Sequence, residues 1–161
     1  MLERLGMSGL MTLNNNYQFY VGKTAQNWIT ILNVYFEMEM VEKFALELSG
    51  QIKGVFLSVY YFDNDYWIMN VIEDGKKLTT HIAGESMEYN DLQEEIGDIK
   101  IIKSKLDLNV TEAELEKILR IGNLETQVTA LEKVMGVTLW IGASGDVDDD
   151  RELAEKFEVI A

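Results

Sequence analysis

Four aspartates stand within five positions near the end of the chain, in the stretch SGDVDDDRELAEKF at 144–157. A calcium loop of the EF-hand kind begins D-x-[DN]-x-[DN]-G and has a glutamate at position twelve, so that oxygen atoms surround the ion. Three aspartates match positions one, three and five of such a loop: Asp146, Asp148 and Asp150. Arg151 stands where the glycine should be and Phe157 where the glutamate should be, so the metal pattern is incomplete.

A helix N-terminus explains the same aspartates better. Asp148 or Asp149 then caps a helix from about Asp150 to Phe157, and the remaining carboxylates lie near its positive end. We therefore expect a helix here and assign no metal ligand, while weak ion binding by residues 146–150 stays open.

Two glycine-containing stretches match catalytic motifs only in part. VGKT at 21–24 follows a predicted strand, but a phosphate-binding loop also needs a glycine at position 17, which is Tyr17 here. GASG at 142–145 falls short of the G-x-S-x-G elbow that exposes a nucleophilic serine. We interpret the first stretch as the end of a strand and the second as a connection.

The remaining candidate groups are one histidine and many carboxylates. His81 is the single histidine, so it cannot belong to a multi-histidine metal site, and the six serines show no triad motif. We expect His81 to be structural, on a sheet face beside Thr79. Twenty-eight acidic residues make carboxylate pairs unavoidable, so acid–base catalysis is kept as an alternative. No catalytic residue and no cofactor is predicted.

The net charge restricts the class of partner. Twenty-eight acidic and fourteen basic residues give a net charge of −14, whereas binding a polyanion requires Lys or Arg at the phosphates. The predicted helices at 111–121 and 124–135 could form a helix-turn-helix, but the second exposes Glu125, Glu132 and only one basic residue. We expect no nucleic-acid binding. Because residues 85–161 contain nineteen acidic and eight basic residues, we expect a basic protein partner for this half.

Composition also bears on the compartment. The chain has 161 residues, 47% of them hydrophobic, which is enough for one domain with a sizeable core. It has no cysteine, which fits a reducing compartment. Residues 5–22 carry no formal charge, but the amides of NNNYQ at 14–18 would be unpaired in lipid, and the first thirteen residues lack the positive region of a signal peptide. We expect a cytoplasmic protein without a membrane segment.

Residues 17–50 predict two strands and a helix. Aromatic and β-branched residues favour strands at 17–22 and 28–36. From Glu37 the apolar residues take helical spacing: Val41, Phe44, Ala45 and Leu48. This spacing predicts a helix at 37–49 that ends at Gly50, with Glu39, Glu42 and other charged residues mostly away from its apolar face.

Residues 54–82 predict a three-strand meander. Asp74-Gly75 suits a two-residue type I′ turn, because both residues tolerate a positive φ. A regular hairpin around this turn pairs residues on two faces: Val71 with Leu78, Met69 with Thr80 and Trp67 with Ile82 on one, and Ile72 with Lys77, Asn70 with Thr79 and Ile68 with His81 on the other. A second turn centred on Asn64-Asp65 places Phe62 beside Trp67. We expect the face with Trp67 to pack on the helix at 37–49.

The second half predicts mainly helices. DIKIIK at 98–103 suits a short strand, as does VTLWIG at 137–142. Thr111 and Glu114 form a capping box, which starts a helix at 111 or 112 that stops at Gly122. Asn123 caps the next helix, which stops at Gly136.

The first half also resembles a known group of proteins. A strand led by Trp28, a helix ending LELSG, a strand VYYFDND and an aromatic strand with a DG hairpin together cover about residues 28–84. This arrangement is similar to a module of small uncharacterised bacterial proteins. The resemblance implies an α+β fold and a bacterial origin, and it implies no site.

Acidic and aromatic residues come together at one predicted hairpin tip. Asp63, Asp65 and Tyr66 lie there beside Trp67, and aromatic side chains are favoured at protein interfaces. We predict that these four residues form an exposed edge that binds a basic partner.

The sequence thus predicts a single α+β domain, residues 1–161, with a mostly antiparallel sheet packed by helices and an acidic, helical second half. The predicted function is a non-catalytic protein-binding module, immunity-like or regulatory, whose negative charge attracts a basic protein such as a nuclease toxin. Two alternatives remain. One is a small hydrolase that uses an Asp/Glu pair, with or without a divalent metal ion, and the other is a structural homo-oligomer.

Overall fold

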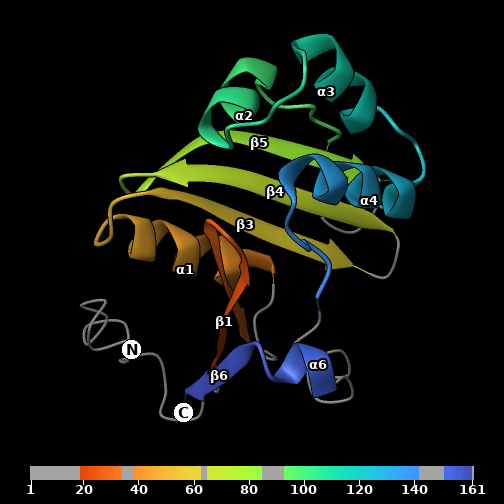
Figure 1. The fold of residues 1–161 in the computed structure, drawn as a ribbon. Helices are drawn as coiled ribbons and strands as arrows, with labels where there is room; N and C mark the ends of the chain where they lie inside the picture. The colour runs from red at the N-terminus through yellow and green to blue at the C-terminus, as the bar shows by residue number, and fades with distance from the viewer. Residues whose placement is uncertain (1–18, 34–37, 63–64, 85–92, 142–150, 161) are drawn as a thin grey trace.

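The computed structural model describes residues 19–33, 38–62, 65–84, 93–141 and 151–160. They form two three-stranded antiparallel sheets with helices packed on them (Figure 1). The larger sheet has the order β3-β4-β5, with β3 at Val55–Phe62, β4 at Tyr66–Glu73 and β5 at Lys76–Gly84. The smaller has the order β2-β1-β6, with β1 at Phe19–Ala25, β2 at Trp28–Asn33 and β6 at Phe157–Ile160. The predicted α+β fold with antiparallel sheet is confirmed.

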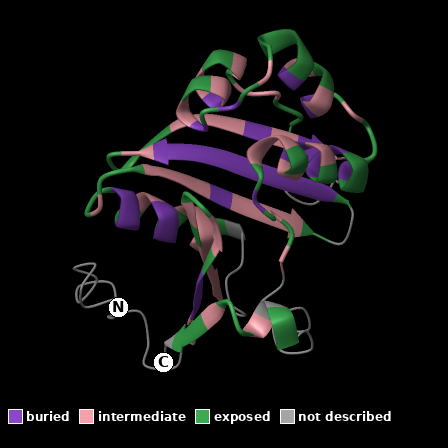
Figure 2. Cartoon of the chain, in the orientation of Figure 1, coloured by how far each residue is buried: buried purple, intermediate pink, exposed green. Residues whose placement is uncertain are grey.

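β4 is the central strand of the larger sheet and is buried along nearly its whole length (Figure 2). One face of this sheet packs on α1 (Met38–Ser49), and the other packs on helices of the second half of the chain. These helices are α2 at Ile99–Lys105, α3 at Glu112–Leu119 and α4 at Leu124–Met135. Because both faces are covered, β4 is apolar at successive positions instead of alternating.

The face toward α2, α3 and α4 forms the main core. Trp67, Met69 and Val71 of β4 point into it, and none of the three is exposed. The helices contribute aliphatic side chains to the same cluster: Ile102, Leu115, Leu119, Leu124, Val128 and Leu131. Each buried side chain of this size contributes about 1.5–3 kcal/mol before the entropy cost of ordering it. This layer is therefore the main source of stability among the described elements.

α1 lies between the two sheets. Its Phe44 and Leu48 form a cluster with Phe56 of β3 on one side and with Phe19 and Ile31 of the smaller sheet on the other. The rings of Phe19 and Phe44 stack with their centroids 5.5 Å apart. Phe44 and Leu48 thus link α1 to both sheets through one hydrophobic cluster.

The end of α1 is joined to the tip of the β4–β5 hairpin. The backbone N–H of Gly75 donates a hydrogen bond to Ser49 Oγ at 2.9 Å, and Ser49 Oγ donates to the carbonyl of Leu46 at 3.0 Å. The predicted turn at Asp74-Gly75 is confirmed, with φ of 50° and 70° at its two residues. The turn therefore fixes both the hairpin and the position of α1.

The predicted pairing of β4 with β5 is wrong beyond the first two pairs. Glu73 pairs with Lys76 and Ile72 with Lys77, but Val71 then pairs with Thr79, so Leu78 is an extra residue. An extra residue of this kind is a β-bulge, and it moves every later side chain of β5 to the other face.

The predicted pairing of β3 with β4 is also shifted by one residue. Phe62 pairs with Tyr66 and Tyr61 with Trp67, so three residues separate the strands where a two-residue turn was expected. As a result Trp67, Met69 and Val71 of β4 point away from α1, and Ile68 and Asn70 point toward it. A shift of one position reverses all the side chains of a strand, because their period is two.

Local helix signals in the second half are confirmed, with one exception. Thr111 and Glu114 form the capping box, Asn123 accepts from the backbone of Thr126, and Gly136 ends α4 with φ 67°. The stretch at 98–103, however, is helical, because the carboxylate of Asp98 caps α2 by accepting from Lys100 N and Ile101 N. A short apolar run is ambiguous between strand and helix, and the cap decides here. α3 ends at Leu119, before the predicted stop at Gly122.

The C-terminal region differs from the expected one. Residues 137–141 form no strand, whereas β6 at Phe157–Ile160 was not predicted and pairs with β1. The helix expected up to Phe157 is the four-residue α6 at Arg151–Ala154. The aspartates at 146–150 lie outside the described residues. The strand at 17–22, the strand at 28–36 and the helix at 37–49 are confirmed over Phe19–Ala25, Trp28–Asn33 and Met38–Ser49.

None of the helices in the described part of the chain has the length and apolar character needed to cross a membrane.

Candidate binding pocket between α1 and the sheet

A small pocket lies between α1 and the adjacent face of the larger sheet. Its volume is about 150 Å³. Sites for small organic ligands are usually about 300–1,000 Å³, so this pocket has the size of a single side chain. α1 contributes Glu39, Val41 and Glu42, and the sheet contributes Ser58, Tyr60, Ile68, Asn70, Lys77, Thr80 and Ile82.

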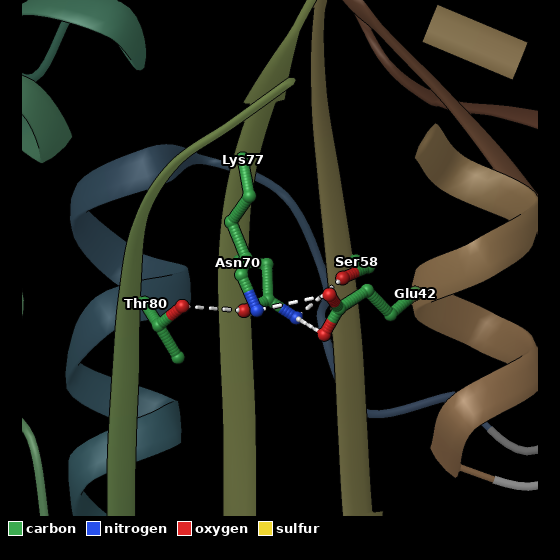
Figure 3. A network of polar contacts seen from close by, with 5 residues as sticks. All are labelled: Glu42, Ser58, Asn70, Lys77 and Thr80. Atoms are coloured by element: carbon green, nitrogen blue, oxygen red, sulfur yellow. Dashed lines mark hydrogen bonds and ion pairs between the residues drawn. The ribbon is translucent and has the colours of Figure 1, made fainter. Parts of the chain in front are cut away.

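Five of these residues are joined by hydrogen bonds and an ion pair (Figure 3). Asn70 Nδ2 donates to Ser58 Oγ at 3.0 Å and to Glu42 Oε2 at 3.3 Å. Thr80 Oγ1 donates to Asn70 Oδ1 at 2.8 Å. Lys77 Nζ donates to Glu42 Oε1 at 2.9 Å. Asn70 is therefore the centre of the network, and it holds the Glu42 carboxylate in one orientation.

Strand register brings the polar side chains into one row across the sheet. Asn70 on the central strand pairs with Ser58 on β3 and with Thr80 on β5. In a regular hairpin Asn70 would face Thr79 instead, and Thr80 would point to the other side. The bulge at Leu78 is therefore what completes the row.

The charges at the pocket favour a cation. Two carboxylates, Glu39 and Glu42, line it together with one ammonium group, that of Lys77. The Glu42 and Lys77 side chains keep 34% and 40% of their surface exposed, so their ion pair is in contact with water. Such exposed pairs contribute only about 0.2–1 kcal/mol to stability. The arrangement thus binds an ammonium group without locking it in place.

An aromatic row continues from the pocket along the same face of the sheet. Tyr60 lines the pocket, its ring lies 6.2 Å from that of Tyr66, and Tyr66 stacks on Phe62 at 5.5 Å. Phe62 is 46% exposed, and Asp65, whose backbone N–H donates to the Phe62 carbonyl at 2.8 Å, is exposed as well. The rings of Tyr60, Tyr66 and Phe62 therefore connect the pocket to the tip of the β3–β4 hairpin.

The predicted binding edge is exposed only in part. Asp65 is exposed, whereas Tyr66 is 7% exposed and Trp67 is fully buried. Asp63 lies outside the described residues. The expectation that Tyr66 and Trp67 are exposed is wrong, because the pairing of Phe62 with Tyr66 makes both aromatic residues part of the central strand. Trp67 in particular belongs to the core on the opposite face.

A second polar cluster lies in that core. Trp67 Nε1 donates to Gln127 Oε1, and His81 Nε2 lies 3.1 Å from the same oxygen. Gln127 Nε2 in turn donates to the carbonyls of Leu119 at 2.8 Å and Ile121 at 2.9 Å, which fixes the orientation of the amide. Because every polar group is matched inside the core, this cluster has a structural role.

His81 is structural, as expected, but it shares a face of the sheet with Trp67 and Met69 instead of Ile68. It pairs with Met69 instead of Ile68, because the bulge shifts β5 by one position. Burial lowers the pKa of the His81 imidazole below its usual value of 6.5, and this outweighs the hydrogen bonds with Gln127 and Ile96, which raise it. The ring is therefore neutral in the folded protein at neutral pH.

Sequence reasoning missed the pocket residues and the polar cluster in the core, although each had one signal. Ser58 and Asn70 are single polar residues within apolar strands, VFLSVYY and WIMNVI, and a buried polar group needs partners. Gln127 likewise falls on the apolar face of α4, between Leu124 and Val128. Glu42 was expected on the solvent side of its helix, and nothing in its spacing indicates the pocket.

In the described ranges, no three His, Cys, Asp or Glu side chains lie close enough together to hold a metal ion. Comparisons of the chain with protein-family models, curated proteins and solved structures found no match.

Proposed function

We propose that this chain is a non-catalytic binding protein whose acidic surface engages a basic protein, with the pocket beside α1 as the point of contact. Immunity-like neutralisation of a basic toxin is one form that this function takes. The observation that carries the proposal is the pocket itself, which has the size of one side chain and already holds an ammonium group against Glu42.

The distribution of acidic side chains supports the same function. Over the described ranges no Asp or Glu side chain is buried, so these carboxylates contribute to the field outside the molecule. Together with a net charge of −14, such a field accelerates encounter with a positively charged partner. Binding that depends on this field should weaken strongly as salt is added.

The proposal is tested by retaining a partner on the immobilised chain from an extract of the source cells, and then measuring the association rate of the purified partner. We expect a basic protein whose association rate falls at least tenfold between low and physiological salt. An association rate that does not change with salt contradicts the proposal, and so does the retention of no basic protein.

A matched pair of double variants locates the contact. Glu39→Gln with Glu42→Gln removes two charges at the pocket, whereas Glu112→Gln with Glu125→Gln removes two exposed charges at the starts of α3 and α4. Both variants lower the general attraction equally, so the pocket variant should also raise the dissociation rate. Equal effects of the two variants on dissociation would place the contact elsewhere.

A second candidate function is a small hydrolase that uses an Asp/Glu pair. Glu39 and Glu42 are one helical turn apart and line the same pocket, beside the hydroxyl groups of Ser58 and Thr80. Glu42→Gln should then abolish hydrolysis of a chromogenic ester, glycoside or phosphate substrate that the unmodified chain cleaves. Calorimetric titration with calcium, magnesium and manganese tests the metal-dependent version of this candidate.

A further inference from the structure

The cation in the pocket and the carboxylate that binds it are held very differently. Glu42 Oε2 accepts from Asn70 Nδ2, and Asn70 is itself buried and fixed by Ser58 and Thr80. Lys77 reaches Glu42 Oε1 from an exposed position near the hairpin tip, and among the described residues Glu42 is the only hydrogen-bond partner of its ammonium group. The anion is therefore positioned by the fold, while the cation is replaceable.

The geometry of the acceptors suits a planar cation better than an ammonium group. A guanidinium group presents five N–H donors in a rigid fork and pairs with a carboxylate through two parallel hydrogen bonds, whereas an ammonium group is a compact point charge. The hydroxyl oxygens of Ser58 and Thr80 are further acceptors at the pocket.

The walls of the pocket suit the rest of an arginine side chain. Val41, Ile68 and Ile82 are apolar and can cover the methylene stem, and the ring of Tyr60 offers a face on which a guanidinium group stacks. A volume of about 150 Å³ is of the size of one such side chain and is below that of most sites for small organic ligands.

We propose that Lys77 is an internal occupant of an arginine-binding pocket, and that a guanidinium group of the basic partner replaces its ammonium group at Glu42. This inference rests on the proposed function, because it names the side chain through which the partner is recognised. Lys77 sets the affinity, because an incoming arginine competes with it for the same carboxylate.

The test uses Nα-acetyl-L-arginine amide as the probe, with the citrulline and lysine analogues as controls, and follows the amide signals of Asn70 and Thr80 by NMR. Citrulline has nearly the same shape as arginine without the charge. We expect arginine to shift these signals at millimolar concentration, lysine to bind more weakly, and citrulline to cause no shift. Equal binding of arginine and lysine contradicts the selectivity, and binding of citrulline contradicts the role of Glu42.

Two substitutions at position 77 and one at position 76 form a series. Lys77→Met removes the internal competitor and should tighten arginine binding about two- to fivefold, which is the factor that an exposed ion pair allows. Lys77→Arg supplies a stronger competitor and should weaken binding. Lys76→Met is the control, since it makes the same change of charge at an exposed neighbouring position and should change the affinity less.

The outcomes separate this inference from the proposed function. If Lys77→Met binds the probe no more tightly than Lys76→Met, the displacement of Lys77 is wrong. If Glu42→Gln binds arginine as well as the unmodified chain, or if no variant binds it, the arginine pocket is wrong. Association with a basic protein is measured separately, and the salt dependence of its rate tests the proposed function whatever the result for the arginine pocket. Because the ion pair is partly exposed, we expect these variants to fold, and a thermal unfolding curve verifies this for each of them.

Discussion

The two faces of the β3-β4-β5 sheet accommodate buried polar side chains in different ways. Each face contains buried polar groups from the strands, those of Ser58 and Asn70 on one side and those of Trp67 and His81, which bind Gln127, on the other. Toward α2, α3 and α4 the polar groups are enclosed by apolar side chains and matched to one another. Toward α1 they border a pocket that contains two carboxylates.

This difference separates polar groups that specify the fold from polar groups available to a ligand. A network sealed in a core is costly to break, because water cannot replace a lost hydrogen bond. A network at a pocket is less costly to change, because water or an incoming ligand satisfies the groups that lose a partner. We therefore expect substitutions on the first face to reduce stability and substitutions on the second to alter binding.

The largest contrast should come from two aromatic residues on neighbouring strands. Trp67→Ala empties the fully buried core and should cost about 3–5 kcal/mol in the free energy of unfolding. Tyr60→Ala on the pocket face removes a partly exposed ring and should cost less than about 2 kcal/mol. Urea denaturation followed by circular dichroism measures both, and equal losses would show that the two faces are packed alike.

A smaller contrast should separate the two buried amides. Gln127→Leu leaves the Trp67 indole N–H and two backbone carbonyls without their partner, at a cost of about 2–4 kcal/mol. Asn70→Leu should cost about 1 kcal/mol, because Ser58 and Thr80 border the pocket and can bind water. The same denaturation experiment applies. A larger loss for Asn70→Leu than for Gln127→Leu would contradict the distinction between a sealed and an open network.

The smallest effect on the free energy of unfolding should come from protonation of His81 on the core face. The pKa of His81 is lower in the folded protein than its usual value of 6.5, so the unfolded chain takes up the proton first as the pH falls. Stability is therefore unaffected above pH 6.5 and decreases as the pH falls below it. The His81→Gln variant provides the control, since it lacks a titrating ring.

The pH experiment compares the free energy of unfolding at several values between about pH 5 and 7.5, above the range in which most carboxylates titrate. The decrease below pH 6.5 should be present in the unmodified chain and smaller in His81→Gln. The same slope in both proteins would mean that another group is responsible for the pH dependence.

Local signals in the sequence predicted where most described elements begin or end. The Asp74-Gly75 turn, the Thr111–Glu114 capping box and the cap at Asn123 each depend on a few adjacent residues, and each is confirmed. Such signals are satisfied within one turn of chain, so they do not require knowledge of the rest of the fold.

The pairing of strands depended on information that no short stretch contains. The three-residue connection before Tyr66 and the extra residue Leu78 each shift the pairing by one position, so the side chains of β4 face the opposite way to the predicted one relative to both neighbouring strands. β6 was missed because four residues carry little periodic pattern and pair with a strand far away in sequence.

The candidate site was not predicted from the sequence, because it also depends on the pairing of strands. Its network joins one helix and three strands, and its residues fall into a row only when the register is correct. Of the residues predicted to bind a partner, Asp65 alone is exposed within the described ranges, and it lies near the pocket through the aromatic row of Tyr66 and Phe62. Sequence reasoning thus selected an adjacent part of the surface and missed Glu42, whose partners come from other elements.

The bulge in β5 has a consequence for changes in chain length. Deleting Leu78 would leave Ile72 opposite Lys77 and Val71 opposite Thr79, so the hairpin would become regular and every pair would be kept. Deleting one residue further along β5 would instead either keep the bulge and reverse the side chains after the deletion, or remove the bulge and reverse the side chains from Leu78 up to the deletion. A homologous chain that is one residue shorter at position 78 should therefore preserve both the core and the pocket, whereas a gap a few positions later would signal the loss of one of them.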